Sequence, residues 1–192
     1  MSSDNIQELK SNARKNFLKR RINLPENEIT SSNSSILKRV TNLKEFEEAN
    51  TIHVYASMNK RNEVDTFSII DYALKNGKKV IVPVMRENGK LNHCEIDSTD
   101  SLEPNSWGVP EPVNQKTLEH VKPDIIFVPM VAGDLQKNRL GYGKGYYDRF
   151  LSSVNGLKAG LLFEEQISKK ILPTDSYDVT LDILITEKRV LR

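Results

Sequence analysis

The residues best suited to chemistry lie between Arg139 and Arg149, in the sequence RLGYGKGYYDR. Three glycines stand at alternate positions, and the stretch follows the apolar run from Ile125 to Ala132. Glycine has no Cβ and reaches unusual φ/ψ values, so successive N–H groups can point into one anion-binding concavity. Arg139 and Lys144 add full positive charges here. The pattern favours a phosphate site, and a tight surface turn is the alternative.

Charged residues elsewhere could complete such a site. Lys10 and Arg14 are four residues apart on an expected amphipathic helix, so they share one face. The same helix carries further basic residues at Lys15, Lys19, Arg20 and Arg21, and taken alone the set fits a solvated charged face better than a ligand site. Glu63 and Asp65 follow an expected strand, at the sheet edge where open α/β folds bind ligands. Each could instead cap the next helix, although Glu63 is harder to explain in that way.

Composition limits the classes of function. The 192 residues include 28 Lys and Arg against 26 Asp and Glu, a formal net charge of +2, which is unlike a general nucleic-acid binder. The single cysteine, Cys94, excludes an internal disulfide and fits a reducing compartment. With no signal-peptide pattern and no long apolar run, we expect a cytoplasmic protein without membrane or nucleic-acid partners. His93 beside Cys94 lacks a second pair at zinc spacing and indicates an ordinary strand or hairpin.

The positioning elements follow from periodicity. Short apolar runs alternate with amphipathic stretches after residue 50, which is typical of βαβ units around a parallel sheet. We expect strands at 51–56, 79–84, 125–131, 158–163 and 182–186, the last extending through 190, a small hairpin at 89–95, and helices at 5–21, 36–46, 66–75 and 146–153. The predicted fold is a three-layer α/β/α sandwich with a mostly parallel, Rossmann-like open sheet, in a single domain, residues 1–192. The loop 133–145 is long for a βα connection, which indicates a functional loop.

Neither GxxxxGK[ST] nor GxGxxG is present, which argues against the two common nucleotide loops. Instead, NRLGYGKGYYDR after VPMVAGD resembles the signature of the 5-formyltetrahydrofolate cyclo-ligase (5,10-methenyltetrahydrofolate synthetase) family. The resemblance covers nearly the whole chain, from Lys10-x-x-x-Arg14 through YASMNKRNEVDT, GKKVIVPV and SWGVPEP to FEEQ, LP and YDV. Two positions depart from the family pattern: Gly133 replaces a more usual aromatic, and Tyr177 replaces a histidine before the aspartate.

The resemblance implies an ATP- and Mg²⁺-dependent closure of 5-formyltetrahydrofolate to 5,10-methenyltetrahydrofolate, with release of ADP and phosphate. It implies that the formyl oxygen attacks the γ-phosphoryl group and that N10 then attacks the activated carbon. Set against this reaction, the candidate residues divide into three groups: for ATP, Lys10, Arg14, Arg139, Gly141, Tyr142, Gly143, Lys144 and Gly145, with Arg139 and Lys144 also catalytic; for Mg²⁺, Asp148 and then Asp178; for the folate, Ala56, Glu63, Trp107, Tyr146 and Tyr147.

Several alternatives stay open at this point. Either Tyr146 or Tyr147 could simply pack in the core. A phosphosugar enzyme, a non-catalytic nucleotide-binding module or an RNA-contacting first helix would explain parts of the pattern. We expect a monomer or a weak homodimer that takes its folate with or without a polyglutamate tail.

Overall fold

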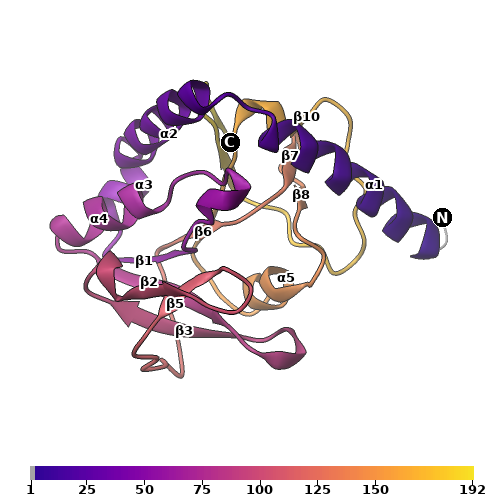
Figure 1. Ribbon diagram of the computed structural model, residues 1–192. Coiled ribbons are helices and arrows are strands. Elements are labelled where there is room, and N and C mark those ends of the chain that lie inside the picture. Colours follow the sequence, from indigo (N-terminus) through magenta and orange to yellow (C-terminus); the bar gives the residue numbers. More distant parts are fainter. Residues whose placement is uncertain (1–2) are drawn as a thin grey trace.

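The computed structural model describes residues 3–192, and a seven-stranded sheet forms its centre (Figure 1). The strand order is β12-β11-β9-β6-β1-β2-β3. The bounds are β1 Thr51–Val54, β2 Lys79–Met85, β3 Leu91–Ile96, β6 Ile125–Val128, β9 Leu157–Leu161, β11 Ile183–Ile185 and β12 Val190–Leu191. Neighbouring strands from β11 to β2 are parallel, and the edge strands β12 and β3 are antiparallel.

Helices cover both faces of this sheet. Their bounds are α1 Ser3–Ile22, α2 Glu26–Thr41, α3 Lys44–Glu48, α4 Phe67–Lys75 and α5 Tyr146–Leu151, with short 3-10 turns η1 Asn59–Arg61, η2 Glu87–Gly89, η3 Thr99–Ser101 and η4 Glu164–Gln166. Figure 1 shows α3 and α5 on opposite sides of the sheet. Phe46 of α3 packs against Phe127 of β6 on one face, and Phe150 of α5 packs against His53 of β1 on the other. The predicted α/β fold with a mostly parallel open sheet is confirmed.

Two central strands end earlier than predicted. β1 stops at Val54 rather than at residue 56, and β6 stops at Val128 rather than at residue 131. Pro129 follows β6, and proline has no N–H with which to continue a central ladder. The apolar residues beyond both strands remain buried, so the periodicity of the sequence did not reveal where pairing stops. Three of the residues beyond the strand ends, Tyr55, Ala56 and Pro129, line a pocket instead.

The predicted small hairpin at 89–95 is wrong in its placement. Those residues form β3, which pairs with β2 from Val80↔Ile96 to Met85↔Leu91 and is an edge of the main sheet. The helix predicted at 36–46 is divided between two helices: α2 starts earlier, at Glu26, includes the serine-rich segment and ends at Thr41, and residues 44–46 belong to α3. Hydroxyls such as those of Ser34 and Ser35 donate to backbone carbonyls four residues earlier, which lets them sit inside a helix.

The long loop after β6 contains structure of its own. It forms a hairpin of β7 Ala132–Asp134 and β8 Arg139–Leu140, and β10 Ile167–Ser168 pairs with β7. Helix α1 lies across this three-stranded sheet (Figure 1), and Phe17 and Leu140 share its small apolar core. A separate ribbon joins β4 Leu102–Pro104 to β5 Pro110–Pro112. No helix within residues 3–192 is long and apolar enough to cross a membrane.

Candidate active site

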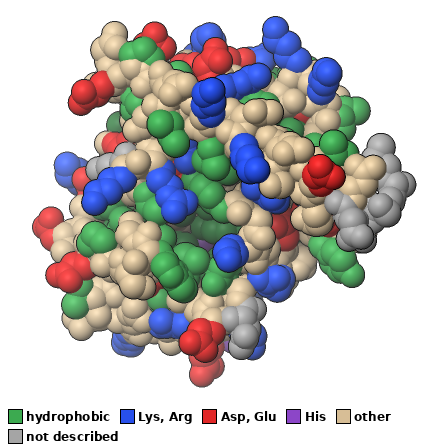
Figure 2. Space-filling view, turned by 45° about the vertical axis from the view of Figure 1, so that its right-hand side comes forward, with side chains coloured by type: hydrophobic (Ala, Val, Ile, Leu, Met, Phe, Trp, Pro, Cys, Tyr) green, Lys and Arg blue, Asp and Glu red, His purple; other side chains and the backbone are tan. Residues whose placement is uncertain are grey.

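A pocket of about 620 Å³ opens at the carboxyl ends of the central parallel strands. Tyr55 and Ala56 after β1, Pro129 after β6 and residues of β2 form one side, and the segment 139–148 forms the other. The space-filling view shows apolar side chains gathered in a central hollow with Lys and Arg side chains around it (Figure 2). This is the position that open α/β sheets use for ligands.

The glycine segment takes its shape from backbone conformations that glycine alone adopts easily. Gly143 has φ +91° and Gly145 has φ +69°, and Gly145 precedes the first residue of α5. Arg14 lies against this segment, because its Nε donates to the carbonyl oxygen of Gly141 at 2.8 Å. A Cβ at Gly143 would stand only 3.1 Å from the Arg14 guanidinium carbon. The structure therefore brings the first helix and the glycine segment together.

Lys10 is not on a solvated face. Its side chain is 5% exposed, and Nζ lies 2.5 Å from Asp178 Oδ2 and 2.7 Å from Asp175 Oδ2. The hydrogen bond from Lys10 is the main reason that the pKa of Asp175 lies below its usual value. Lys10 and Asp178 lie outside the wall of the pocket, so α1 ties down the 175–178 loop beside the site.

A second ion pair joins the glycine segment to α5. Arg139 Nη2 lies 2.6 Å from Asp148 Oδ1, and both residues line the pocket. The same Oδ1 accepts from the N–H of Val179 at 3.4 Å, which places Asp148 next to the segment that follows Asp178. Within residues 3–192 no group of three or more His, Cys, Asp and Glu side chains is arranged to hold a metal.

Glu63 is buried in the pocket wall and accepts two hydrogen bonds. Its Oε2 accepts from the N–H of Met58 at 2.8 Å, and its Oε1 accepts from the hydroxyl of Tyr142. Burial, and then the negative charge of Glu63, raise the pKa of Tyr142. Asp65 differs, because it accepts from Phe67 N–H at 3.0 Å and so caps the start of α4. Of the two acidic candidates in this loop, only Glu63 faces the pocket.

Aromatic side chains form the rest of the wall. Trp107, in the turn between β4 and β5, is 59% exposed and lines the pocket. Tyr146 donates its hydroxyl to the carbonyl oxygen of Arg86 at 2.9 Å. The hydroxyl of Tyr147 is buried without a partner among the described residues, and burial raises the pKa of Tyr147. Both tyrosines line the pocket and also pack on the main core, so neither belongs to the core alone.

The structure also explains one of the two departures from the family pattern. A Cβ at Gly133 would lie 2.8 Å from Leu184 Cδ1 and 2.9 Å from Met130 Cε, so neighbouring side chains already occupy that space. Tyr177, by contrast, is 84% exposed. Its side chain therefore contributes little to packing around Asp178.

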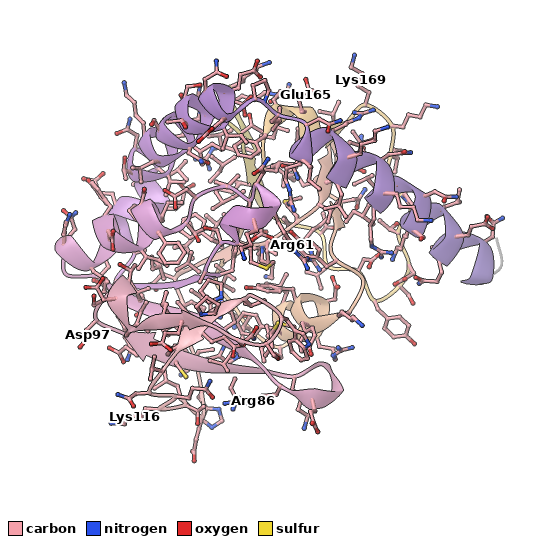
Figure 3. All side chains as sticks on the ribbon, viewed as in Figure 1. Arg61, Arg86, Asp97, Lys116, Glu165 and Lys169 are labelled. Carbon is pink, nitrogen blue, oxygen red and sulfur yellow. The ribbon has the colours of Figure 1, made fainter. Side chains whose placement is uncertain are left out.

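Sequence reasoning missed two arginines. Arg21 was grouped with solvated basic residues, yet it is 2% exposed and donates to Tyr142. Its spacing of seven residues from Arg14 places both on one helical stripe, and that spacing was the available signal. Arg61 of η1 lies near the centre of Figure 3, and its guanidinium stands 5.6 Å from the Tyr142 ring centroid on the pocket wall.

An open α/β sheet whose pocket joins a basic glycine segment to an aromatic wall is suited to a phosphorylated ligand beside a flat ring. A model of the 5-formyltetrahydrofolate cyclo-ligase family matches residues 6–187. The chain is 34% identical over 185 residues to a probable 5-formyltetrahydrofolate cyclo-ligase of Schizosaccharomyces pombe, covering 88% of this chain and 90% of that protein. It is 30% identical over 195 residues to the 5-formyltetrahydrofolate cyclo-ligase of Haemophilus influenzae, covering 96% and 100%.

A solved structure is similar over the same length. The NMR structure of Aquifex aeolicus 5,10-methenyltetrahydrofolate synthetase matches with a TM-score of 0.84 at 36% identity, over 96% of this chain and 92% of that one. The chain belongs to the 5-formyltetrahydrofolate cyclo-ligase family. Its activity is the ATP-dependent conversion of 5-formyltetrahydrofolate to 5,10-methenyltetrahydrofolate.

Proposed function

We propose that this enzyme closes the folate ring by transferring the γ-phosphoryl group of ATP to the formyl oxygen, in the pocket between the glycine segment and the Glu63 wall. The formyl oxygen attacks phosphorus, ADP leaves, and the N5 lone pair forms the iminium phosphate. N10 then attacks the activated carbon and loses its proton, and phosphate leaves with the oxygen. An amide-like formyl oxygen is a poor leaving group until it is phosphorylated, which is why ATP is required.

One observation supports this proposal above the others. Cationic side chains and the glycine backbone share one pocket with a carboxylate and an aromatic wall, so a phosphate chain and a flat ring can lie next to each other there. Phosphoryl transfer needs chiefly positioning and charge stabilisation rather than covalent catalysis. The lining residues supply both.

On the ATP side, Arg139 and Lys144 would stabilise the negative charge that develops on the transferring group. Arg14 would contact phosphate from the first helix, since only its Nε is engaged with Gly141. The backbone of residues 141–145 would donate further hydrogen bonds to phosphate oxygens. Lys10 would act indirectly: it would hold the 175–178 loop in place through its ion pairs with Asp175 and Asp178, without lining the pocket itself.

The residues present fit a magnesium ion with few protein ligands. Asp148 lines the pocket with a side chain that is 20% exposed, and its Oδ1 is occupied by Arg139, which leaves Oδ2 to face a cation. Mg²⁺ commonly binds through one or two carboxylates together with waters and substrate phosphates. Asp148 would hold it, and the ion would neutralise phosphoryl charge. Asp178, the second candidate, lies outside the pocket wall and pairs with Lys10, so it would reach the same ion only if that pair opened.

On the folate side, Glu63 would accept hydrogen bonds from the N–H donors of the pterin. Each of its oxygens already accepts one bond, and a carboxylate oxygen can accept a second. Ala56, Tyr146, Tyr147 and Trp107 would enclose the ring system, and Tyr147 offers a buried hydroxyl with no partner among the described residues. We expect the enzyme to work as a monomer or a weak homodimer, which sedimentation analysis would test.

The direct test mixes the protein with ATP, Mg²⁺ and 5-formyltetrahydrofolate and follows the near-ultraviolet absorbance of the methenyl product. We expect product, ADP and phosphate in equal amounts, and loss of all three when ATP or Mg²⁺ is omitted. A flat trace from well-folded protein would overturn the proposal. ADP release without methenyl product would instead indicate a nucleotide hydrolase.

A paired variant tests the role of the first helix. Lys10→Ala combined with Arg14→Ala should raise the KM for ATP more than the KM for the folate. An unchanged KM for ATP would assign both side chains to structure alone.

A further inference from the structure

Arg21 is a buried cation that none of the proposed catalytic roles uses. It lies in the last turn of α1 and is 2% exposed. Its Nη2 donates to the hydroxyl oxygen of Tyr142 at 2.9 Å, and its Nη1 donates to the carbonyl oxygen of Met130 at 3.3 Å. The guanidinium carbon also lies 5.8 Å from the centroid of the Tyr142 ring. Burying an arginine without a carboxylate partner is costly, so these contacts call for an explanation.

The contacts continue beyond Tyr142. The Tyr142 hydroxyl donates to Glu63 Oε1, and Glu63 Oε2 accepts from the N–H of Met58. The chain of bonds therefore joins three distant parts of the sequence: the first helix, the glycine segment and the loop after β1. Glu63 is its only acidic member, and it lies in the wall of the pocket.

Arg21 and Glu63 together fix the direction of the two hydrogen bonds at the Tyr142 hydroxyl. A guanidinium has only donors, so the Tyr142 oxygen must accept from it. The single hydroxyl hydrogen of Tyr142 is then free to point only at Glu63, which must accept. Without Arg21 the hydroxyl could rotate and accept from another donor, and Glu63 would lose a partner that holds it in place.

We propose that Arg21 is a positioning residue for the folate site, acting through the Tyr142 hydroxyl to hold Glu63 as an acceptor that faces the pocket. This rests on the proposed function in one respect, namely that Glu63 receives the donors of the pterin. Because Tyr142 belongs to the glycine segment, its hydrogen bond to Glu63 also connects the phosphate side of the pocket to the folate side.

A simpler role would be a structural one, in which Arg21 only ties α1 to the carbonyl of Met130. That role makes the Tyr142 hydroxyl irrelevant to Arg21. The two can be separated, since only the positioning role predicts that changes at Arg21 and Tyr142 affect the same kinetic constant and fail to add.

The experiment measures both KM values and kcat for Arg21→Met, Tyr142→Phe and the double variant. Loss of a hydrogen bond to a charged group corresponds to about tenfold, so each single variant should raise the KM for 5-formyltetrahydrofolate by about that factor, with a smaller effect on the KM for ATP. The double variant should be no worse than either single one. Arg21→Lys, which keeps charge and donors, should recover part of the loss.

Arg20→Met is the matched control, because Arg20 precedes Arg21 on α1 but lies exposed over the Phe17 ring, with its guanidinium carbon 4.8 Å from the centroid. It should behave like the unchanged enzyme. Equal effects of Arg20→Met and Arg21→Met, or multiplicative effects in the double variant, would overturn the inference. If Arg21→Met does not fold, an unchanged folate KM in Tyr142→Phe overturns it instead.

Failure of this inference is distinguishable from failure of the proposed function. If the unchanged enzyme makes no methenyl product, the proposed function fails. The inference is then tested by equilibrium binding of 5-formyltetrahydrofolate, where Tyr142→Phe and Arg21→Met should weaken binding by the same factor and Arg20→Met should not. Equal binding by all four proteins would overturn it.

Discussion

Arg139 and Asp148 form an ion pair that is largely withdrawn from water, with Nη2 and Oδ1 2.6 Å apart and side chains 5% and 20% exposed. Asp148→Asn removes the charge but nearly keeps the shape, so it leaves a buried guanidinium without its counter-charge. We expect a loss of about 2 kcal/mol in the free energy of unfolding, together with a higher Mg²⁺ requirement for turnover. Urea denaturation and a Mg²⁺ titration of activity would measure these effects.

The control for that variant is a surface pair. Lys44 and Glu48 lie 3.5 Å apart on α3 with side chains 80% and 67% exposed. Glu48→Gln should cost less than about 0.5 kcal/mol, because exposed pairs contribute little, and it should leave the Mg²⁺ requirement unchanged. Equal losses of unfolding free energy in Asp148→Asn and Glu48→Gln would show that burial of the Arg139–Asp148 pair does not add to its contribution to stability.

Gly143 combines a left-handed backbone with close contact to Arg14. Gly143→Ala places a Cβ 3.1 Å from the Arg14 guanidinium carbon at a residue with φ +91°. We expect a stability cost of about 1 kcal/mol from the backbone and a clearly larger KM for ATP, because Arg14 must move. Gly77→Ala has a similar φ of +73° but no atom within 4 Å of the new Cβ. It should show the stability cost alone, and a raised ATP KM in this control would refute the assignment.

Trp107 offers an optical test of the folate wall. It is the only tryptophan of the chain, it is 59% exposed, and it lines the pocket. Stacking of a pterin ring on the indole should quench its fluorescence and reduce its exposure to water. Titration with 5-formyltetrahydrofolate should therefore give a saturable quench that ATP alone does not give. Trp107→Phe should retain part of the affinity, whereas Trp107→Ala should lose more, and absence of any quench would place the folate elsewhere.

His53 and His93 should make the stability of the enzyme depend on pH. They lie beneath α5 with Nε2 of His53 3.1 Å from Nδ1 of His93, and both rings pack on Phe150. Burial lowers the pKa of both, that of His93 from 6.5 to about 4. Between pH 6.5 and about 4, the unfolded chain binds more protons at these histidines than the folded chain does. The free energy of unfolding therefore falls as the pH drops through this range, and above pH 6.5 the two histidines do not affect it.

Urea midpoints measured from about pH 7 to about pH 5 would test this slope. His93→Gln should flatten the pH dependence, because one of the two groups that must stay neutral in the folded state is removed. A slope that is unchanged in this variant would mean that other groups control the acid sensitivity.

Some features followed from the sequence alone because they depend on local chemistry. The alternation of apolar runs with amphipathic stretches predicted the parallel sheet, since strand and helix periods differ along the chain itself. The alternate glycines of residues 141–145 predicted a segment with unusual φ values, and Gly143 and Gly145 have them. The order of the motifs from Lys10 to Asp178 predicted the family to which the chain belongs.

Other features were decided only by the tertiary structure. Lys10 and Arg21 were indistinguishable from solvated neighbours on the first helix, because charge and spacing do not state what will cover a helix face. Lys10 meets Asp178, 168 residues away, and Arg21 meets Tyr142, 121 residues away. Such pairs form only when the chain folds and brings distant segments into contact. A buried charge without a partner is strongly destabilising, so the packing of the folded chain determines which of the available partners each charge contacts.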